Sequence, residues 1–148
     1  MSKPSKIYFS RPHVTAREIE LVTSAIASRR LSGDGDFTRA CESKLSTLVG
    51  APVLLTNSGT AALDMAAMLA GLKPGDEVIL PSFTFSSTAN AVVLRGAVPV
   101  FVDVDPGTLN IDPRRTAEAV TPRTRAIFVV HYAGVGADRK STRLNSSH

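Results

Sequence analysis

Short, continuously apolar runs alternate with segments of helical character through residues 52–130, and this alternation constrains the fold most strongly. The runs cover residues 52–56, 77–80, 98–103 and 125–130. Apolar and polar side chains do not alternate within them, which is typical of strands covered on both faces of a sheet. Strands that alternate with helices predict an α/β fold.

Helices are expected before and between these runs, at residues 15–30, 37–49, 61–72, 83–95 and 113–120. Thr15 with Glu18 three residues later matches a capping box, and Pro113 suits the first turn of a helix. The segment 61–72 is rich in Ala, Leu and Met and predicts a buried helix, whereas 83–95 begins as a loop.

Composition limits the class of protein. The chain has 148 residues, 43% of them hydrophobic and 20% charged, which suits one ordinary domain. No apolar run approaches the roughly 18 residues needed to cross a bilayer. The single cysteine, Cys41, excludes an internal disulfide framework and a Cys-rich zinc site. We therefore expect a cytoplasmic protein without a membrane partner.

The last ten residues, 139–148, do not continue the strand–helix rhythm. They are polar and contain Arg139, Lys140 and Arg143 but no acid. The rest of the chain then has 14 basic and 13 acidic residues, so the net charge of +4 comes mostly from this tail. We expect a native domain over residues 1–138, a non-native tail over 139–148, and no nucleic-acid partner.

The first candidate site is the Ser58-Gly-Thr-Ala61 turn between a strand and a helix. Free N–H groups in the first turn of a helix favour an anion, and Gly59 permits close approach. Phosphate binding by Gly59, Thr60 and Ala61 is one interpretation. The alternative is that Ser58 and Thr60 only cap the helix.

Further candidates follow later strands. Phe83 and Phe85 stand where α/β sheets bind ligands and could stack on a planar ring, or could fill the core beneath a loop. His131 and Tyr132 also follow a strand. His131 could act as an acid or base or bind a phosphate or sugar, although a hydrogen-bonded structural histidine is more common there. The Asp103–Asp105 pair favours a turn cap over a metal site. Asp34, between two glycines, suits a sugar hydroxyl or a plain turn.

Seven stretches of this sequence, taken in order, resemble the DegT/DnrJ/EryC1/StrS family of sugar aminotransferases. They span residues 33–38, 55–63, 74–79, 81–90, 101–104, 109–112 and 130–134. Three runs are similar to the subgroup of dTDP-4-amino-4,6-dideoxygalactose transaminases. The resemblance implies a partial large domain of the type I aminotransferase fold, with three αβα layers and a mixed, mostly parallel sheet.

The resemblance also implies pyridoxal 5'-phosphate as the cofactor. Gly59, Thr60 and Ala61 would then hold its phosphate, and Phe85 would stack on the pyridine ring. Asp34, His131 and Tyr132 would lie near the substrate. The family reaction moves an amino group from glutamate to the 4-keto carbon of a nucleotide-linked 6-deoxyhexose, here dTDP-4-keto-6-deoxyglucose, in homodimers that serve polysaccharide biosynthesis.

The Schiff-base lysine and the aspartate beside the pyridine nitrogen follow residue 134 in the family, and neither is present here. The lysines are Lys3, Lys6, Lys44, Lys73 and Lys140. We therefore expect no catalytic residue in this chain and no activity from it alone. The alternative is a non-catalytic module that binds phosphate or a nucleotide sugar.

Overall fold

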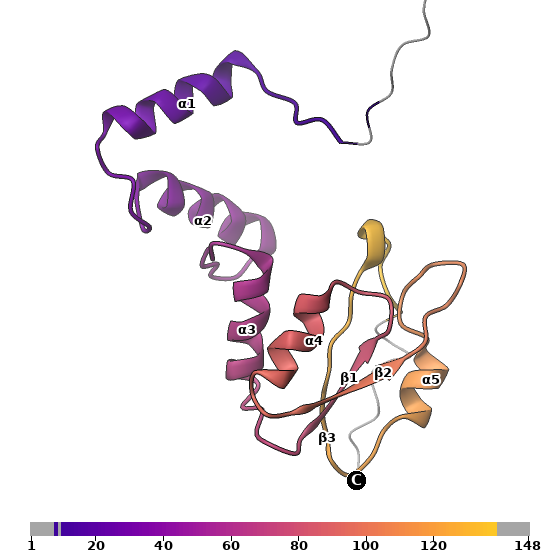
Figure 1. Cartoon of the computed structure of the whole chain (residues 1–148). Coiled ribbons are helices and arrows are strands. Elements are labelled where there is room, and N and C mark those ends of the chain that lie inside the picture. Colours follow the sequence, from indigo (N-terminus) through magenta and orange to yellow (C-terminus); the bar gives the residue numbers. More distant parts are fainter. Residues whose placement is uncertain (1–7, 9, 139–148) are drawn as a thin grey trace, which may run out of the picture. The chain divides into compact units, whose positions relative to one another are not determined.

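The computed structural model describes residue 8 and residues 10–138. The chain divides into two compact units at Leu55 and Thr56, called here the N-terminal unit and the sheet unit. Figure 1 labels the α-helices and strands of both units. The tail expected to be non-native, residues 139–148, lies outside the described residues.

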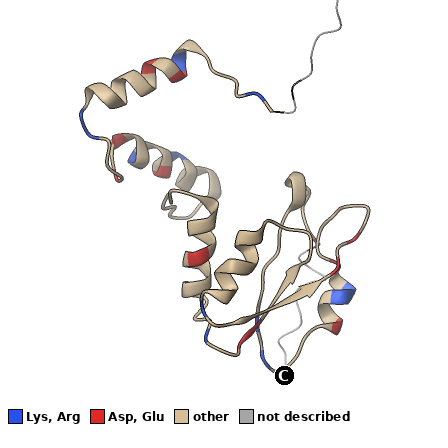
Figure 2. Ribbon diagram, in the orientation of Figure 1, with Lys and Arg blue, Asp and Glu red and all other residues tan. Residues whose placement is uncertain are grey.

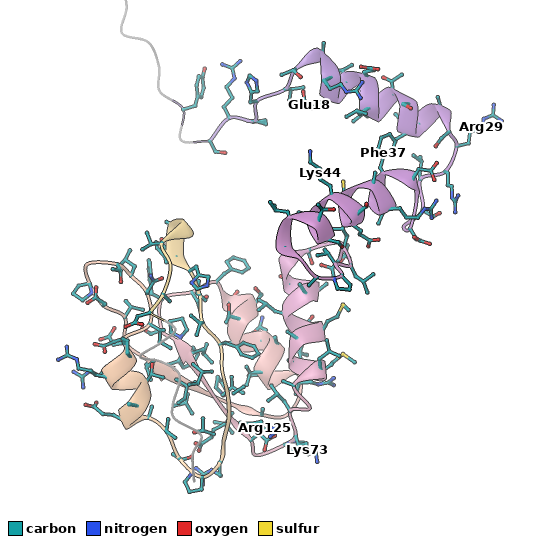
Figure 3. The ribbon with its side chains drawn as sticks, turned by 180° about the vertical axis from the view of Figure 1, so that it is seen from behind. Glu18, Arg29, Phe37, Lys44, Lys73 and Arg125 are labelled. Carbon is teal, nitrogen blue, oxygen red and sulfur yellow. The ribbon has the colours of Figure 1, made fainter. Side chains whose placement is uncertain are left out.

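The N-terminal unit contains α1 (Ala16–Ala27) and α2 (Asp36–Val49). The predicted capping box is confirmed at the start of α1. The Arg17 N–H donates to Oγ1 of Thr15 at 3.2 Å, and the Thr15 N–H donates to Oε2 of Glu18 at 2.6 Å. Glu18 lies at this end of α1 (Figure 3). Hydrogen bonds from the Thr15 side chain and backbone lower the pKa of the Glu18 carboxyl.

The strand predicted at residues 52–56 is wrong. Gly50 ends α2 in the left-handed conformation, with φ 70°, and the chain turns back along the helix. The Val53 N–H then donates to Oγ of Ser46 at 2.9 Å, and the Leu55 N–H donates to Oε1 of Glu42 at 2.8 Å. Side chains of α2 therefore bind the backbone donors that a strand would need for pairing.

The sheet unit contains three parallel strands in the order β2-β1-β3. The strands are β1 (Glu77–Pro81), β2 (Val98–Val102) and β3 (Thr124–Ile127). The helices are α3 (Gly59–Leu69), α4 (Ser86–Val93) and α5 (Pro113–Glu118), followed by the 3-10 turn η1 (Tyr132–Gly134). The connections between parallel strands contain helices, as a parallel sheet requires.

Helices cover both faces of this sheet, which confirms the predicted α/β class. Val78 and Leu80 of β1 pack on one face with Ala67 of α3 and Val92 of α4. Ile79 points to the opposite face. There it packs with Val102, Ile111 and the partly buried Ala119 next to α5, on the other side of the sheet in Figure 1. All five residues of β1 are buried.

Burial is less complete away from β1. Ala67 is the one buried residue of α3, while Met68 and Leu69 are 60% and 86% exposed. The prediction of a buried helix at 61–72 is therefore wrong for its outer face, because among the described residues α3 packs mainly on α4. Phe101 of β2 is also exposed.

Among the described residues, no helix is both long and apolar enough to cross a bilayer.

Candidate functional site

A pocket of about 840 Å³ opens at the carboxyl end of the parallel strands of the sheet unit. Its lining comes from the start of α3, from the loop and helix after β1, and from the segment after β3. The lining residues are Gly59, Thr60, Leu63, Phe83, Thr84, Phe85, Ser87, Thr88, Val129, Val130 and Tyr132. This is the edge of an open α/β sheet at which ligands bind.

Gly59 and Thr60 bring the first turn of α3 to the pocket. Within the described part of the chain, the N–H groups of these two residues have no hydrogen-bond partner. The Ala61 N–H instead donates to Oγ of the N-cap Ser58 at 3.1 Å, and Ala61 does not line the pocket. The turn is therefore both a helix cap and a place with two free donors for an anion.

Phe83 and Phe85 follow β1 and form an apolar side of the pocket. Their residues are 47% and 75% exposed. The interpretation that they fill the core beneath a loop is therefore wrong. An exposed ring at a pocket wall is free to pack on a planar ligand. A ring buried in the core could not contact a ligand.

Three hydroxyl side chains of the pocket, Thr84, Ser87 and Thr88, were not singled out from the sequence. Oγ1 of Thr84 and Oγ1 of Thr88 share a hydrogen bond of 2.9 Å. Ser87 and Thr88 are buried on α4, although they line the pocket. The sequence signal that could have identified them is their position in the 81–90 stretch, which follows a strand. The pocket therefore combines an apolar wall with hydroxyl donors and acceptors.

Tyr132 reaches the pocket, but His131 does not line it. The Tyr132 ring lies against Phe83, with ring centroids 5.0 Å apart and planes tilted by 46°. Nδ1 of His131 accepts a hydrogen bond from the Ala137 N–H at 2.9 Å. A neutral imidazole bonded in this way carries its proton on Nε2.

The remaining candidates occupy turns. Asp34 belongs to the N-terminal unit, has φ 58°, and its carboxylate lies 3.4 Å from Nη1 of Arg39. Oδ1 of Asp105 accepts from the N–H groups of Gly107 and Thr108, each at 2.9 Å, which confirms the turn cap. Among the described residues there is no cluster of three or more metal-ligating side chains.

Asp64 is the one acidic residue of α3, which therefore carries red in Figure 2. Its Oδ1 is buried and has no hydrogen-bond partner among the described residues. A buried carboxylate oxygen without a donor destabilises a protein. A donor supplied to this atom would therefore stabilise α3.

Comparison with known sequences identifies the family. A profile described as the DegT/DnrJ/EryC1/StrS aminotransferase family matches residues 12–144. The chain is 45% identical over 131 residues to the spore coat polysaccharide biosynthesis protein SpsC of Bacillus subtilis (strain 168). This match covers 88% of the chain and 33% of SpsC, so the chain spans about a third of that relative's length.

Solved structures agree with the fold. The chain superposes with a TM-score of 0.84 on the aminotransferase from Psychrobacter cryohalolentis, at 34% identity over 90% of this chain and 35% of that one. NtdA from Bacillus subtilis, solved with the cofactor PMP (pyridoxamine 5'-phosphate), gives a TM-score of 0.79 at 38% identity. That match covers 88% of this chain and 31% of NtdA.

Proposed function

This chain belongs to the DegT/DnrJ/EryC1/StrS aminotransferase family, and from that premise we propose that it supplies half of a pyridoxal 5'-phosphate site in a longer sugar aminotransferase. The observation that carries the proposal is the pocket of the sheet unit. It places the free N–H groups of α3 and the exposed ring of Phe85 around one space. Free N–H groups suit the phosphate of a phosphorylated aromatic cofactor, and an exposed aromatic ring suits its planar ring.

The residues present fit this cofactor. The N–H groups of Gly59 and Thr60, with the Thr60 hydroxyl, would hold the phosphate. The Phe85 ring would lie on the pyridine and exclude water from that face. When bound, the cofactor withdraws electron density from the reacting carbon, which is the step that amino transfer needs.

The proposed reaction transfers an amino group from glutamate to the 4-keto carbon of dTDP-4-keto-6-deoxyglucose. Two observations support amino transfer to a sugar: the family membership, and the relation to SpsC, whose name refers to polysaccharide biosynthesis. The choice of this sugar is proposed from the resemblance of three sequence runs to dTDP-4-amino-4,6-dideoxygalactose transaminases. Asp34, His131 and Tyr132 are the proposed neighbours of the sugar. We place the reaction in the cytoplasm, in a homodimer.

The chain by itself is proposed to be inactive. Among the described residues, the pocket lining contains no lysine. Lys73 precedes β1, and Figure 3 shows it near Arg125 of β3, where the strands begin and not where the pocket opens. We propose that a lysine that holds the cofactor and moves the proton, and an aspartate that keeps the pyridine nitrogen protonated, come from outside residues 1–138.

The test compares the 148-residue chain with the protein encoded by the source locus, sequenced past the codon for Asp138. Glutamate, pyridoxal 5'-phosphate and dTDP-4-keto-6-deoxyglucose are supplied to both, and the sugar product is identified by mass spectrometry and NMR at carbon 4. We expect a 4-amino sugar from the longer protein and none from the 148-residue chain. Amine transfer by the short chain would contradict its proposed inactivity.

The second candidate is a non-catalytic module that binds phosphate or a nucleotide sugar, and the absence of lysine from the described pocket lining favours it. If the reading frame of the locus ends at His148 and the chain binds dTDP-4-keto-6-deoxyglucose without converting it, this second function replaces the first. If the frame continues into a lysine-bearing segment, the aminotransferase proposal stands.

A further inference from the structure

Asn110 is one of few buried polar residues in the sheet unit, and it lies outside the pocket lining. It is 4% exposed and stands in the hairpin between β2 and α5. This hairpin is held by an antiparallel bridge between Val104 and Ile111 and by the Asp105 N–H, which donates to the Asn110 carbonyl at 2.9 Å. The backbone of Asn110 is therefore fixed independently of its side chain.

The side-chain amide of Asn110 binds the turn η1 at both ends. Its Oδ1 accepts from the Tyr132 N–H at 2.9 Å, and its Nδ2 donates to the Val135 carbonyl at 3.1 Å. These bonds join positions 22 and 25 residues apart in sequence. Because an amide has one acceptor and one donor group, asparagine satisfies both backbone groups of the turn at once.

The turn held in this way carries the Tyr132 ring. Tyr132 lines the pocket and packs on Phe83, another lining residue, at 5.0 Å between ring centroids. Ala133 within the turn has φ 50°, a left-handed conformation that is unfavourable for an alanine. The two bonds from Asn110 therefore oppose the relaxation of a strained turn and keep one pocket wall in place.

We infer that Asn110 is a positioning residue for the ligand site, because its two hydrogen bonds hold the turn from which Tyr132 packs on Phe83. The inference rests on the proposed function only for the identity of the ligand. Neither Asp nor Leu replaces the amide: a carboxylate at residue 110 keeps the acceptor for the Tyr132 N–H but repels the Val135 carbonyl, and Leu removes both bonds.

The test uses the emission of Tyr132. The chain contains two tyrosines and no tryptophan, so a Tyr8→Phe background leaves Tyr132 as the one tyrosine. Two measurements are made in this background: quenching of the emission by acrylamide, and its saturable quenching by pyridoxamine 5'-phosphate. That probe carries an amine in place of the aldehyde, so it does not react with the lysines.

Three variants are compared with the Tyr8→Phe background: Asn110→Leu, Asn110→Asp and the control Thr116→Ala. Thr116 of α5 is buried as well, and its Oγ1 donates to the carbonyl of the N-cap residue Asp112, so the control removes a hydrogen bond of a buried side chain outside the pocket lining. Asn110→Asp retains one of the two bonds and serves if Asn110→Leu does not fold.

We expect Asn110→Leu to increase acrylamide quenching of Tyr132 and to weaken probe binding roughly tenfold, since loss of about 1.4 kcal/mol corresponds to that factor. Asn110→Asp is expected between Asn110→Leu and the background, and Thr116→Ala should match the background in both measurements. Unchanged quenching and unchanged affinity in both Asn110 variants would overturn the inference.

The two proposals fail in different ways. If the Tyr8→Phe background itself does not bind the probe, the proposed function fails, while acrylamide quenching still tests whether Asn110 holds Tyr132. Equal loss of affinity in Thr116→Ala and in the Asn110 variants would show a general effect of instability, which also overturns the positioning role.

Discussion

At the scale of single residues, Phe85 is expected to matter for ligand binding and not for stability. The residue is 75% exposed, so its removal should change the stability of the fold little. Its ring should instead contribute to ligand binding, because aromatic stacking adds about 0.5–1.5 kcal/mol beyond the area buried.

We predict that Phe85→Ala weakens binding of pyridoxamine 5'-phosphate by roughly three- to tenfold, which corresponds to that energy. Titration of tyrosine emission measures the affinity. The matched control is Phe101→Ala, which removes an exposed ring of β2 (55% exposed, against 75% for Phe85) outside this pocket. A similar loss of affinity in both variants would contradict a specific role for Phe85.

Glu77 is a buried acidic residue that joins the start of β1 to the turn before β3. It is 6% exposed, its Oε1 accepts from Nε and Nη2 of Arg123, the first at 2.9 Å, and its Oε2 accepts from Oγ1 of Thr121. These partners, Thr121 first and then Arg123, lower the pKa of Glu77 from the ordinary value of 4.5. The stabilisation is therefore present above pH 4.5 and is lost as the pH falls below it through the lowered pKa.

We predict that Glu77→Gln lowers the urea midpoint at neutral pH, and that the difference from wild type shrinks as the pH falls below 4.5. Urea unfolding between neutral and acid pH measures both. Glu118→Gln serves as the control, since Glu118 pairs with Arg115 at 3.5 Å in an exposed position and should matter little. If the difference in urea midpoint between Glu77→Gln and wild type does not depend on pH, the charge of Glu77 is not the source of the stabilisation.

At the scale of elements, the turn after α4 meets the turn before β1. Gly96 has φ +72°, and a Cβ there would lie 3.0 Å from Cγ and 3.3 Å from Cβ of Pro74. The Gly75 N–H also donates to the Gly96 carbonyl at 3.2 Å. The two turns therefore lie where β1 and β2 enter the sheet, and a Cβ at residue 96 fits between them only if Pro74 shifts.

We predict that Gly96→Ala destabilises the chain by about 1–3 kcal/mol more than Gly71→Ala. Gly71 has φ +66° with nothing within 4 Å of the added Cβ, so that variant should show only the left-handed strain of about 1 kcal/mol. Urea denaturation measures both free energies. Equal losses in the two variants would mean that Pro74 gives way to the new methyl group.

The capping box at the start of α1 is a second local feature that stabilises an element. We predict that Thr15→Ala costs about 1 kcal/mol of helix stability, because it removes the acceptor for the Arg17 N–H. Faster hydrogen exchange of the first-turn amides would report the loss. Thr23→Ala, in the interior of the same helix, should not produce it, since its Oγ1 bonds only to the Ile19 carbonyl.

At the scale of the whole molecule, large apolar side chains remain at the surface of the sheet unit. Met68 and Leu69 of α3, Val93 of α4 and Leu94, which caps α4, are each more than half exposed. Apolar surface of this kind promotes association between molecules. The 148-residue chain should therefore associate as its concentration rises.

We predict that Met68→Lys with Leu69→Lys reduces this association without lowering the unfolding midpoint, because neither side chain is buried. Light scattering over a concentration series is the measurement. Ser43→Lys with Thr47→Lys adds the same charge at exposed polar positions of α2 and controls for charge alone. If the control suppresses association equally, net charge explains the effect.

Local signals in the sequence determined a large part of this protein. The capping box at Thr15, the Pro113 helix start, the Gly50 helix end and the Asp105 turn were all predictable, because each depends on residues a few positions apart. The α/β class was predictable for a related reason: the continuous apolar run at β1 is buried on both faces.

Tertiary structure decided what depends on partners distant in sequence. The sequence of residues 52–56 is typical of a strand. In the structure, the N–H groups of Val53 and Leu55 instead donate hydrogen bonds to side chains of α2. The pocket groups Thr60, Phe85 and Tyr132, whereas His131, Ala61 and Asp34 lie outside its lining. The role inferred for Asn110 depends on two bonds that span more than twenty residues. Sequence patterns describe local preference, but the partner of each backbone group is set only when the chain packs.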